Sequence, residues 1–352
     1  MKKLRKIEII LLFSFLILIY RNNKKKKKNN KVGVIGLRHE VNIGNNLIKY
    51  AISIKLKELG FIPYIIGTHL NNLNINFLKK NTNCVIINQS FTEIKSNDYD
   101  LLMVNSDQTW RRFDKDFYDY GFLKFAEKWN IPKFIYGASI GFDYWGLTKK
   151  DENVAKSLLK NFTGFSVREK GSIQLIKKHL GIEPLFVLDP TLLINKKYYL
   201  KLIENYKSNI NKNENYIFSY LINKDNNTIN FIKKACEKLK YKCYQVEMED
   251  ENSIEEFIYG ISNSKAVITN SFHGTVFSII FDKPFISFIF KNSPKERLYT
   301  LKSIFNFEDR IREYNEVPDI NLLKTPLNIN KTFMELMKNQ SINFLKKNLK
   351  TI

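Results

Sequence analysis

The sequence predicts an α/β protein with two halves that face a common crevice. From Val32 onward, short apolar runs alternate with helix-like segments, which is the pattern of parallel strands covered by helices. A polar stretch at 190–214, rich in Lys, Asn and Tyr, interrupts the pattern, which then begins again. Because paired α/β domains bind ligands at the carboxyl ends of their strands, we expect functional residues in the loops there.

The first half is predicted to form a domain at 32–195, which begins with a strand, a turn and a helix. Residues 32–36 are a β-branched run, 42–46 a turn that contains Gly44, and 47–60 have the apolar spacing of a helix closed by a glycine. Further apolar runs predict strands at 61–66, 84–87, 101–104 and 133–138.

The second half reads as a domain at 196–320, followed by a helical tail at 321–352. Apolar runs predict strands at 216–221, 243–246, 266–269 and 284–289. Helical spacing predicts helices at 228–240, 253–262 and 274–280. The hinge between the halves is expected in the polar stretch at 190–214.

The composition is that of a globular protein, with 44% hydrophobic and 26% charged residues among 352. Wholesale disorder is therefore excluded. Cys84, Cys236 and Cys243 are too few for a disulfide framework, and they lack the paired spacing of a structural zinc site. The cysteines leave the redox compartment open.

The formal net charge is +22, of which +9 lies in the first 30 residues. This excess suits an anionic ligand or an anionic surface, although Lys is abundant along the whole chain and part of the charge can be background. A nucleic-acid partner is disfavoured, because the charge gathers in the leader and no aromatic and basic motif for bases is present.

Residues 1–31 form a basic leader around a short apolar segment. The segment spans 7–20 at most, whereas a membrane-spanning helix needs about 20 residues. No small-residue cleavage site follows Tyr20, and the five lysines at 24–28 oppose translocation. We expect association with a membrane, either inserted or on anionic headgroups, with the side unspecified. The alternative is a leader that is not inserted, and then a cytoplasmic protein.

Two loops after expected strands carry polar side chains that can perform chemistry. Residues 105–110 (NSDQTW) follow the strand at 101–104 and offer the carboxylate of Asp107; the alternative is a helix cap beside a packed Trp110. Residues 165–169 (FSVRE) deliver Arg168, whose guanidinium can bind carboxylate or phosphate through two parallel hydrogen bonds. The alternative for Arg168 is a surface pair with Glu169 or a bond to a loop carbonyl.

A third loop, at 267–275 (VITNSFHGT), combines His273 with the start of an apolar helix. Free backbone N–H groups at a helix N-terminus attract an anion, and an imidazole exchanges a proton near neutral pH. A general acid is therefore predicted here, and a hydrogen-bonded structural His is the alternative. His39, His69 and His179 have no comparable context, and no metal site, P-loop or GxGxxG motif is found.

Seven short blocks within about residues 32–312 resemble, in their order, the polysaccharide pyruvyl transferase family. They are 42–51 (NIGNNLIKYA), 105–110, 136–141 (YGASIG), 166–169 (SVRE), 187–193 (VLDPTLL), 269–278 (TNSFHGTVFS) and 283–285 (KPF). No block is decisive alone, but the ordered set is specific. The resemblance implies a fold like that of GT-B glycosyltransferases, with two Rossmann-like domains on either side of a cleft.

The resemblance also implies transfer of a pyruvyl group from phosphoenolpyruvate to two hydroxyls of a sugar, in the synthesis of a surface glycan. The donor is then a substrate, and no cofactor is expected. By this resemblance Arg168 binds the anionic donor and His273 is the acid. In the reaction so implied, we expect Asp107 to orient an acceptor hydroxyl or to accept its proton. Further expected substrate-binding residues are Asn45, Ser271, Gly274 and Arg297.

The chain departs from the family pattern at two neighbouring positions. Ser271 stands where some members have Arg, so one donor-binding cation is missing, and Asn270 stands where Asp is frequent. Two other functions stay open: a GT-B glycosyltransferase that uses a nucleotide sugar, and a non-catalytic, membrane-anchored protein that binds glycans. The expected partners are phosphoenolpyruvate, a saccharide acceptor that can be lipid-linked, and a membrane surface.

Overall fold

The structure is a computed structural model that describes residues 30–36, 42–68, 70, 72–111, 116–246, 253–290 and 292–351. The apolar segment at 7–20 that we expect at a membrane lies outside the described residues. Among the described residues, no helix is both long and apolar enough to cross a membrane.

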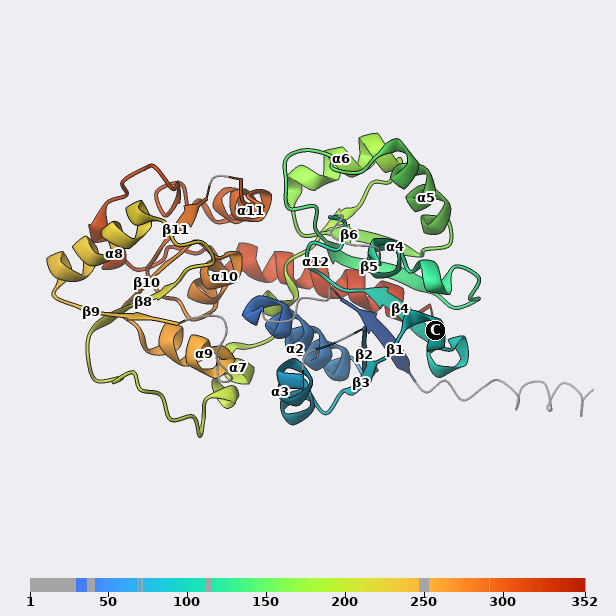
Figure 1. The fold of residues 1–352 in the computed structure, drawn as a ribbon, viewed down its shortest axis with the longest axis horizontal. Helices are drawn as coiled ribbons and strands as arrows, with labels where there is room; N and C mark the ends of the chain where they lie inside the picture. Colours follow the sequence, from blue (N-terminus) through green and yellow to red (C-terminus); the bar gives the residue numbers. More distant parts are fainter. Residues whose placement is uncertain are drawn as a thin grey trace, which may run out of the picture.

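The first domain is built on a seven-stranded parallel sheet with the order β3-β2-β1-β4-β5-β6-β7 (Figure 1). The strands are β1 (Lys31–Ile35), β2 (Ile62–Gly67), β3 (Val85–Asn88), β4 (Leu101–Val104), β5 (Lys133–Ala138), β6 (Gly164–Val167) and β7 (Leu185–Phe186). The helices are α2 (Ile43–Glu58), α3 (Asn72–Thr82), α4 (Phe117–Phe122), α5 (Lys149–Leu159) and α6 (Lys170–Leu180), with 3₁₀ turns η1 (Phe91–Glu93), η2 (Ser96–Asp98) and η3 (Lys124–Ala126).

The second domain is built on a five-stranded parallel sheet with the order β12-β11-β10-β8-β9. Its strands are β8 (Tyr216–Tyr220), β9 (Lys242–Gln245), β10 (Ala266–Thr269), β11 (Phe285–Ile289) and β12 (Ile311–Glu313). Its helices are α8 (Asn226–Leu239), α9 (Ser253–Asn263), α10 (Phe272–Ile280) and α11 (Glu296–Phe305), with η5 (Ile320–Leu323). The connection from the first domain holds η4 (Pro190–Leu192) and α7 (Lys196–Leu202).

Both faces of each sheet are covered, which explains why the strands read as continuous apolar runs rather than as an alternation. In β4, Leu101 and Met103 face one hydrophobic cluster while Leu102 and Val104 face another, and all four are fully buried. The second sheet is arranged in the same way: in β8, Phe218 faces one hydrophobic cluster and Ile217 faces another. The sequence pattern therefore predicted the layers correctly.

One hydrophobic cluster runs through both domains and joins them. Tyr199 of α7 is fully buried and contacts both domains: the centroid of its ring lies 5.9 Å from that of Tyr50 in α2 and 4.8 Å from that of Phe277 in α10. The Tyr199 hydroxyl donates to the carbonyl of Thr191 at 2.8 Å, so the polar end of the ring is satisfied. The connection between the domains is thus part of the core.

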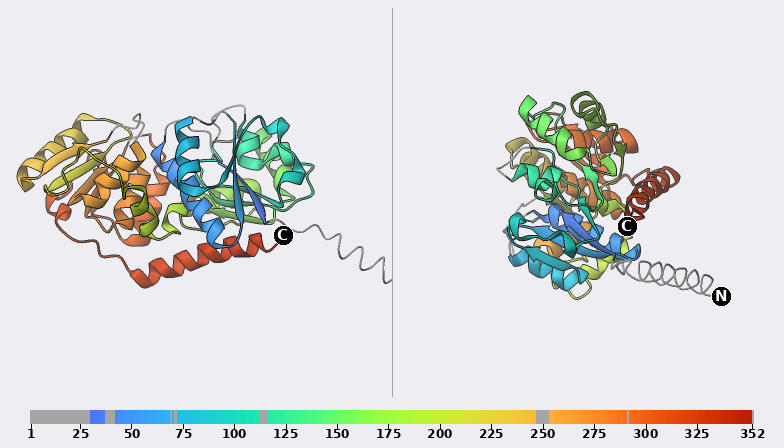
Figure 2. Two further views of the ribbon diagram at one scale, coloured as in Figure 1. Left: turned by 90° about the horizontal axis from the view of Figure 1, so that it is seen from below. Right: turned by 90° about the vertical axis from the view of Figure 1, so that its right-hand side faces the viewer.

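The C-terminal helix α12 (Lys331–Leu349) returns to the first domain and runs along its underside (Figure 2). Phe344 packs against the rings of Phe134 and Tyr136 in β5. The Ser341 hydroxyl accepts a hydrogen bond from the amide of Leu188 at 2.9 Å. The helix expected in the tail at 321–352 therefore completes the core of the first sheet.

Two helices begin earlier than the sequence pattern predicted. Helix α2 begins at Ile43 rather than at 47, because the Asn42 side chain caps it by accepting from the amide of Asn45 at 3.0 Å. Helix α10 begins at Phe272 rather than at 274, because Ser271 caps it in the same way. Both segments read as loops since their Asn, Gly and Ser residues favour turns as well as caps.

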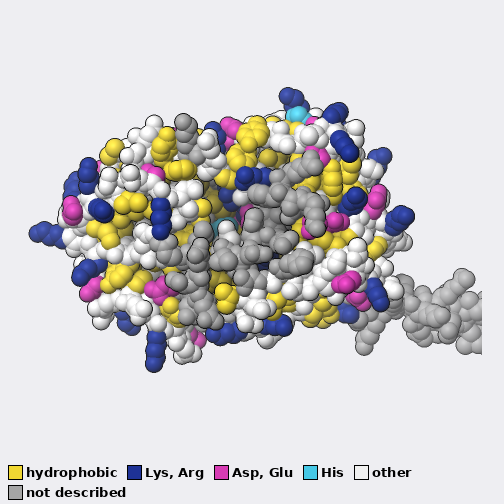
Figure 3. Space-filling model, in the orientation of Figure 1, with side chains coloured by type: hydrophobic (Ala, Val, Ile, Leu, Met, Phe, Trp, Pro, Cys, Tyr) yellow, Lys and Arg dark blue, Asp and Glu magenta, His cyan; other side chains and the backbone are white. Residues whose placement is uncertain are grey.

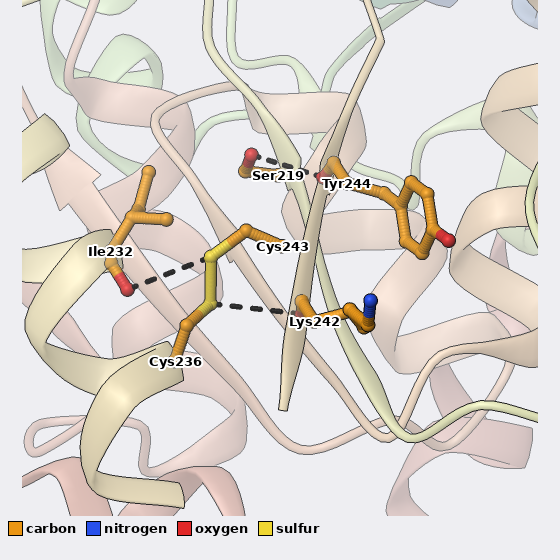
Figure 4. Close-up of a disulfide and its surroundings, with 6 residues drawn as sticks. All are labelled: Ser219, Ile232, Cys236, Lys242, Cys243 and Tyr244. Carbon is orange, nitrogen blue, oxygen red and sulfur yellow. Dashed lines mark hydrogen bonds between the residues drawn. A yellow bond between two sulfur atoms is a disulfide. The ribbon is translucent and has the colours of Figure 1, made fainter. Parts of the chain in front are cut away.

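A disulfide joins Cys236 of α8 to Cys243 of β9, at the edge of the second sheet (Figure 4). The count of cysteines argued correctly against a framework of several disulfides, but it missed this single one. A spacing of seven residues gives no sign of pairing by itself; the turn from α8 into β9 brings the two Cα atoms to 6.2 Å. The remaining Cys84 is a buried thiol.

The disulfide closes a short loop, and we expect its removal to lower the free energy of unfolding by about 2 kcal/mol through the gain in chain entropy of the unfolded state. The measurement is urea unfolding of the unaltered chain and of Cys236→Ala/Cys243→Ala, each with and without dithiothreitol. Reductant should destabilise the unaltered chain and leave the double variant unchanged. Rapid alkylation of both cysteines without reductant would contradict the prediction.

Candidate active site

The candidate site lies where the two sheets have their topological switch points. In the first sheet the crossovers change direction between β1 and β4, and in the second between β8 and β10. Ligands of open α/β sheets bind at such points, outside the carboxyl ends of the strands. Asp107 follows β4, and His273 follows β10. The loops at 105–110, 165–169 and 267–275, which the sequence singled out separately, meet here.

Arg168, directly after β6, lies buried between two carboxylates. Its Nη2 donates to Oδ1 of Asp107 at 2.6 Å, and its Nη1 donates to Oδ2 of Asp189. The side chain is 1% exposed. Arg168 is therefore neither a partner of Glu169 on the surface nor a ligand of a loop carbonyl. A buried guanidinium with two carboxylates fixes the relative positions of the three loops that supply them.

Asp107 is held in an uncommon backbone conformation. Its φ of 108° is one that residues with a side chain rarely adopt, and such strain gathers at functional sites. Burial alone would raise the pKa of Asp107, but the charges of Arg168 and Arg297 hold that pKa well below its usual range. Asp107 therefore stays ionised, which suits a partner of cations better than an acceptor of a hydroxyl proton.

His273 lies in the first turn of α10 and packs against the backbone of α2. A Cβ atom at Gly44 would lie 1.9 Å from His273 Nδ1, so only glycine allows the helix to approach the ring this closely. His273 Nε2 lies 3.8 Å from Oδ2 of Asp189 and has no hydrogen-bond partner within the described part of the chain. A buried ring nitrogen without a partner is available to a ligand.

Burial lowers the pKa of His273 to about 4, and the nearby guanidinium of Arg168 adds to this effect while Asp189 opposes it. The ring is neutral at pH 7 in this state. An anion bound beside it would favour the charged form and raise the pKa, so the ring can gain a proton as an anionic ligand arrives.

Arg297, at the start of α11, brings a second guanidinium to the site from the other domain. Its Nη1 lies 3.7 Å from Oδ1 of Asp107, and its Nε has no hydrogen-bond partner among the described residues. Arg168 and Arg297 both lie over the ring of Phe272, at 5.0 and 5.2 Å. Burial, followed by the charge of Arg168, lowers the pKa of Arg297 to about 10. An anion at this place would relieve the repulsion between the guanidinium groups.

The starts of α2 and α10 face each other at the contact between Gly44 and His273. The amides of Asn45 and Gly274 are occupied by the caps Asn42 and Ser271, whereas helix geometry leaves those of Phe272 and His273 without an intrahelical acceptor. Both helix dipoles therefore favour negative charge between the domains.

Ser271, Gly274 and Asn270 each have a structural role at the start of α10. A Cβ atom at Gly274 would lie 2.3 Å from Oγ1 of Thr269, so this glycine permits a close turn. In the Asn270 side chain, Oδ1 accepts from the backbone amide of Ile222 at 2.7 Å, and Nδ2 donates to the backbone carbonyl of Asn223 at 2.6 Å. An Asp at position 270 could not donate that second bond, which explains Asn in this chain.

Two charged residues at the site were missed by the sequence patterns. Asp189 was interpreted as part of a turn, and it does cap η4, with Oδ1 accepting from the amide of Thr191 at 3.0 Å, while Oδ2 binds Arg168. Lys49 of α2 is 2% exposed, and burial lowers its pKa to about 8 although Asp107 opposes this. Its position among Leu47, Ile48 and Tyr50 was the available signal that this lysine is buried.

Glu169 shapes the loop after β5. Its carboxylate accepts bonds from the Ser139 hydroxyl, from the amides of Ile140 and Gly141 at 3.1 and 3.0 Å, and from the Ser172 hydroxyl at 2.5 Å. The motifs at 136–141 and 166–169 therefore belong together. Trp110 is structural, as the alternative interpretation had it, since its ring stacks on Phe122 in the core.

No group of three or more His, Cys, Asp or Glu side chains within the described ranges is arranged to hold a metal ion. On the face drawn in Figure 3, Lys and Arg side chains are scattered over both domains rather than gathered in one patch. The buried cations are therefore the feature of the site that favours a small anion.

Comparison with known proteins identifies the family and the fold. A family model described as "Polysaccharide pyruvyl transferase" matches residues 42–292, which is more than half of the chain. Comparison with curated protein sequences gives no match.

Three solved structures illustrate the fold. UDP-GlcNAc 2-epimerase of Neisseria meningitidis bound to UDP-GlcNAc is 11% identical with a TM-score of 0.55, covering 92% of this chain and 100% of its own. UGT89C1 of Arabidopsis thaliana complexed with UDP-L-rhamnose is 9% identical with a TM-score of 0.54 and the same coverage. MnaA of S. aureus with UDP is 13% identical with a TM-score of 0.50, covering 92% and 97%. The expected GT-B-like pair of Rossmann-like domains is thereby confirmed.

The neutral state of His273 predicts how stability depends on pH. Between pH 6.5 and 4 the unfolded chain takes up a proton at this position and the folded chain does not, so the free energy of unfolding falls as the pH falls. Between pH 7 and pH 5.5 the free energy of unfolding should fall by about 1 kcal/mol more in the unaltered chain than in His273→Gln. Urea unfolding of both proteins at both pH values measures this difference. Equal losses would show that the folded chain also protonates His273 in this range.

Proposed function

Because the chain belongs to the polysaccharide pyruvyl transferase family, we propose that it transfers a pyruvyl group from phosphoenolpyruvate to two hydroxyl groups of a saccharide, giving a cyclic ketal. The observation that carries this proposal is the convergence of Arg168, Arg297 and the unpartnered Nε2 of His273 between the starts of α2 and α10. The expected acceptor is a unit of a polysaccharide or of a lipid-linked glycan.

The charges of the site suit this donor. Phosphoenolpyruvate carries a carboxylate and a phosphate, and both need fixed positive partners throughout the reaction. Arg168 keeps its two carboxylates, so it acts mainly as a fixed charge, whereas Arg297 has one long contact with Asp107 and can turn its guanidinium toward a ligand. Arg297 thus takes the part of the cation that position 271 does not supply.

His273 supplies the proton that starts the reaction. Binding of the anionic donor raises its pKa, so the ring becomes charged and can protonate the methylene carbon of phosphoenolpyruvate, leaving an oxocarbenium centre at C2. A sugar hydroxyl adds to C2 and loses its proton. The bond from C2 to the phosphate oxygen then breaks and releases inorganic phosphate, and the second hydroxyl adds to the regenerated cation. One hydroxyl proton restores His273, and the other leaves with phosphate.

Asp189 and Gly44 position His273 for this step. Asp189 Oδ2, at 3.8 Å from Nε2, favours the charged form that the reaction requires. The absence of a side chain at Gly44 lets the ring lie directly between the two helices. Asp107 balances Arg168 and Arg297 and keeps both guanidinium groups in place.

A glycosyltransferase that uses a nucleotide sugar is the second candidate. The observation in its favour is the shared fold, since two of the similar solved structures contain a UDP-sugar. Fold does not fix the donor, however, and the family match favours the pyruvyl donor. In a glycan-binding protein without catalysis, His273→Ala would leave the biological effect unchanged.

Arg297 provides the sharpest test of the donor. We expect calorimetric titration of the full chain with phosphoenolpyruvate at moderate salt to show saturable binding, and Arg297→Met to raise Kd roughly ten- to a hundredfold through loss of a charge-assisted contact. Arg312→Met is the matched control, because Arg312 pairs with Glu316 on the surface of the same domain. Binding of UDP-sugars without binding of phosphoenolpyruvate would instead support the glycosyltransferase.

Membrane association through residues 7–20 forms a separate part of the proposal. The full chain should float with vesicles of phosphatidylcholine and phosphatidylserine and should be released by high salt, since each leader lysine near an anionic surface contributes about 1 kcal/mol. A chain of residues 30–352 should stay in solution. Equal flotation of both chains would place the membrane contact elsewhere, and flotation of neither would exclude the leader as an anchor under these conditions.

A further inference from the structure

A second polar cluster lies at the switch point of the first sheet, next to the site described above. The amide of Asn105 donates to the carbonyl of Ile35 at 2.7 Å, so the ends of β1 and β4 lie side by side. Gly36 follows β1 and Asn105 follows β4, and a Cβ atom at Gly36 would lie 4.0 Å from that of Asn105. This is the position at which open α/β sheets bind ligands.

The Asn105 side chain is the evidence that a ligand binds at this place. The residue is fully buried, and neither its Nδ2 nor its Oδ1 has a hydrogen-bond partner among the described residues. A buried amide atom without a partner costs about 1–3 kcal/mol, and native structures contain few such groups. A bound molecule with an oxygen acceptor would satisfy the Nδ2 group.

Lys49 brings a positive charge to the same cluster from α2. Its Cε lies 3.4 Å from the position that a Cβ atom at Gly36 would take, so the glycine leaves room for the lysine chain. Lys49 is 2% exposed, and Asp107 acts on it electrostatically. Buried ionisable groups with shifted pKa values gather at functional sites, so this lysine is a candidate to contact a ligand beside Asn105.

We propose that Lys49 and Asn105 form a second anion subsite, which binds the anionic group of the donor that Arg168 and Arg297 do not hold. The proposal rests on the proposed function, since it assigns the second of two anionic groups on one small molecule. The two subsites adjoin at Asp107, which binds Arg168, lies near Arg297 and acts electrostatically on Lys49.

The test is the affinity of the full chain for phosphoenolpyruvate, measured by calorimetry. Lys49→Met should raise Kd roughly ten- to a hundredfold, and Asn105→Ala should raise it severalfold. Lys55→Met is the matched control, because Lys55 is a buried lysine on the same helix that pairs with Glu58 at 2.5 Å. This control should leave Kd unchanged.

Stability separates a ligand-binding role from a structural one. Methionine replaces the buried charge by an apolar chain of similar length, and Lys49→Met should remain folded with a cooperative urea transition, so that a change in Kd reports binding. Loss of stability with unchanged Kd would overturn the proposal and make Lys49 a structural residue.

Titrations with inorganic phosphate alone and with pyruvate alone identify the group that the subsite holds. The anion whose affinity falls in Lys49→Met, and not in Arg297→Met, is the one bound by Lys49 and Asn105. If the unaltered chain fails to bind phosphoenolpyruvate, the proposed function falls, and the phosphate titration still decides whether a subsite exists. Unchanged affinity for all three probes in Lys49→Met would overturn the subsite while leaving the proposed function intact.

Discussion

The ion pairs of Arg168 with Asp107 and Asp189 fix the relative positions of the chain segments that form the candidate site. The three residues come from the ends of β6 and β4 and from the beginning of η4, so the pairs fix three separate segments at one place. Asp189 also caps η4, where the chain leaves for the second domain. Removing one partner would leave a buried charge uncompensated, which costs about 3–5 kcal/mol. The same bonds therefore hold both the site and the first turn of the connection between the domains.

The site stores electrostatic cost that a ligand can relieve. Two guanidinium groups lie over one phenylalanine ring, and a buried His is neutral although Asp189 lies 3.8 Å away. The pKa values of Arg297 and His273 are both lowered by burial, to about 10 and about 4. A bound anion would relieve the repulsion between the two guanidinium groups and would favour the charged form of His273.

The alternation of apolar runs and helical spacing predicted the layers and most strands, because every strand of a covered parallel sheet is apolar. The loops at 105–110, 165–169 and 267–275 were predicted from their position after such strands. Asp189 and Lys49 could not be found in this way. Asp189 lies in an Asp-Pro sequence, which a turn explains without any further role. Lys49 carries a charge, and a charged side chain is ordinarily expected at the surface. The Cys236–Cys243 disulfide depends on the turn between α8 and β9, which spacing alone does not specify.

The site is complete only where the two domains meet. Arg297 and His273 belong to the second domain. Asp107, near Arg297, belongs to the first domain, and Asp189, near His273, lies where the chain leaves the first domain. Two hydrogen bonds hold helix α11, which carries Arg297, on the first domain. The backbone amide of Glu296 donates to the carbonyl of Gly141 at 3.2 Å, and the backbone amide of Lys170 donates to the side-chain hydroxyl of Thr300 at 3.0 Å. The contacts that join α11 to the first domain therefore also hold Arg297 beside Asp107, and the position of the second guanidinium depends on how the two domains pack.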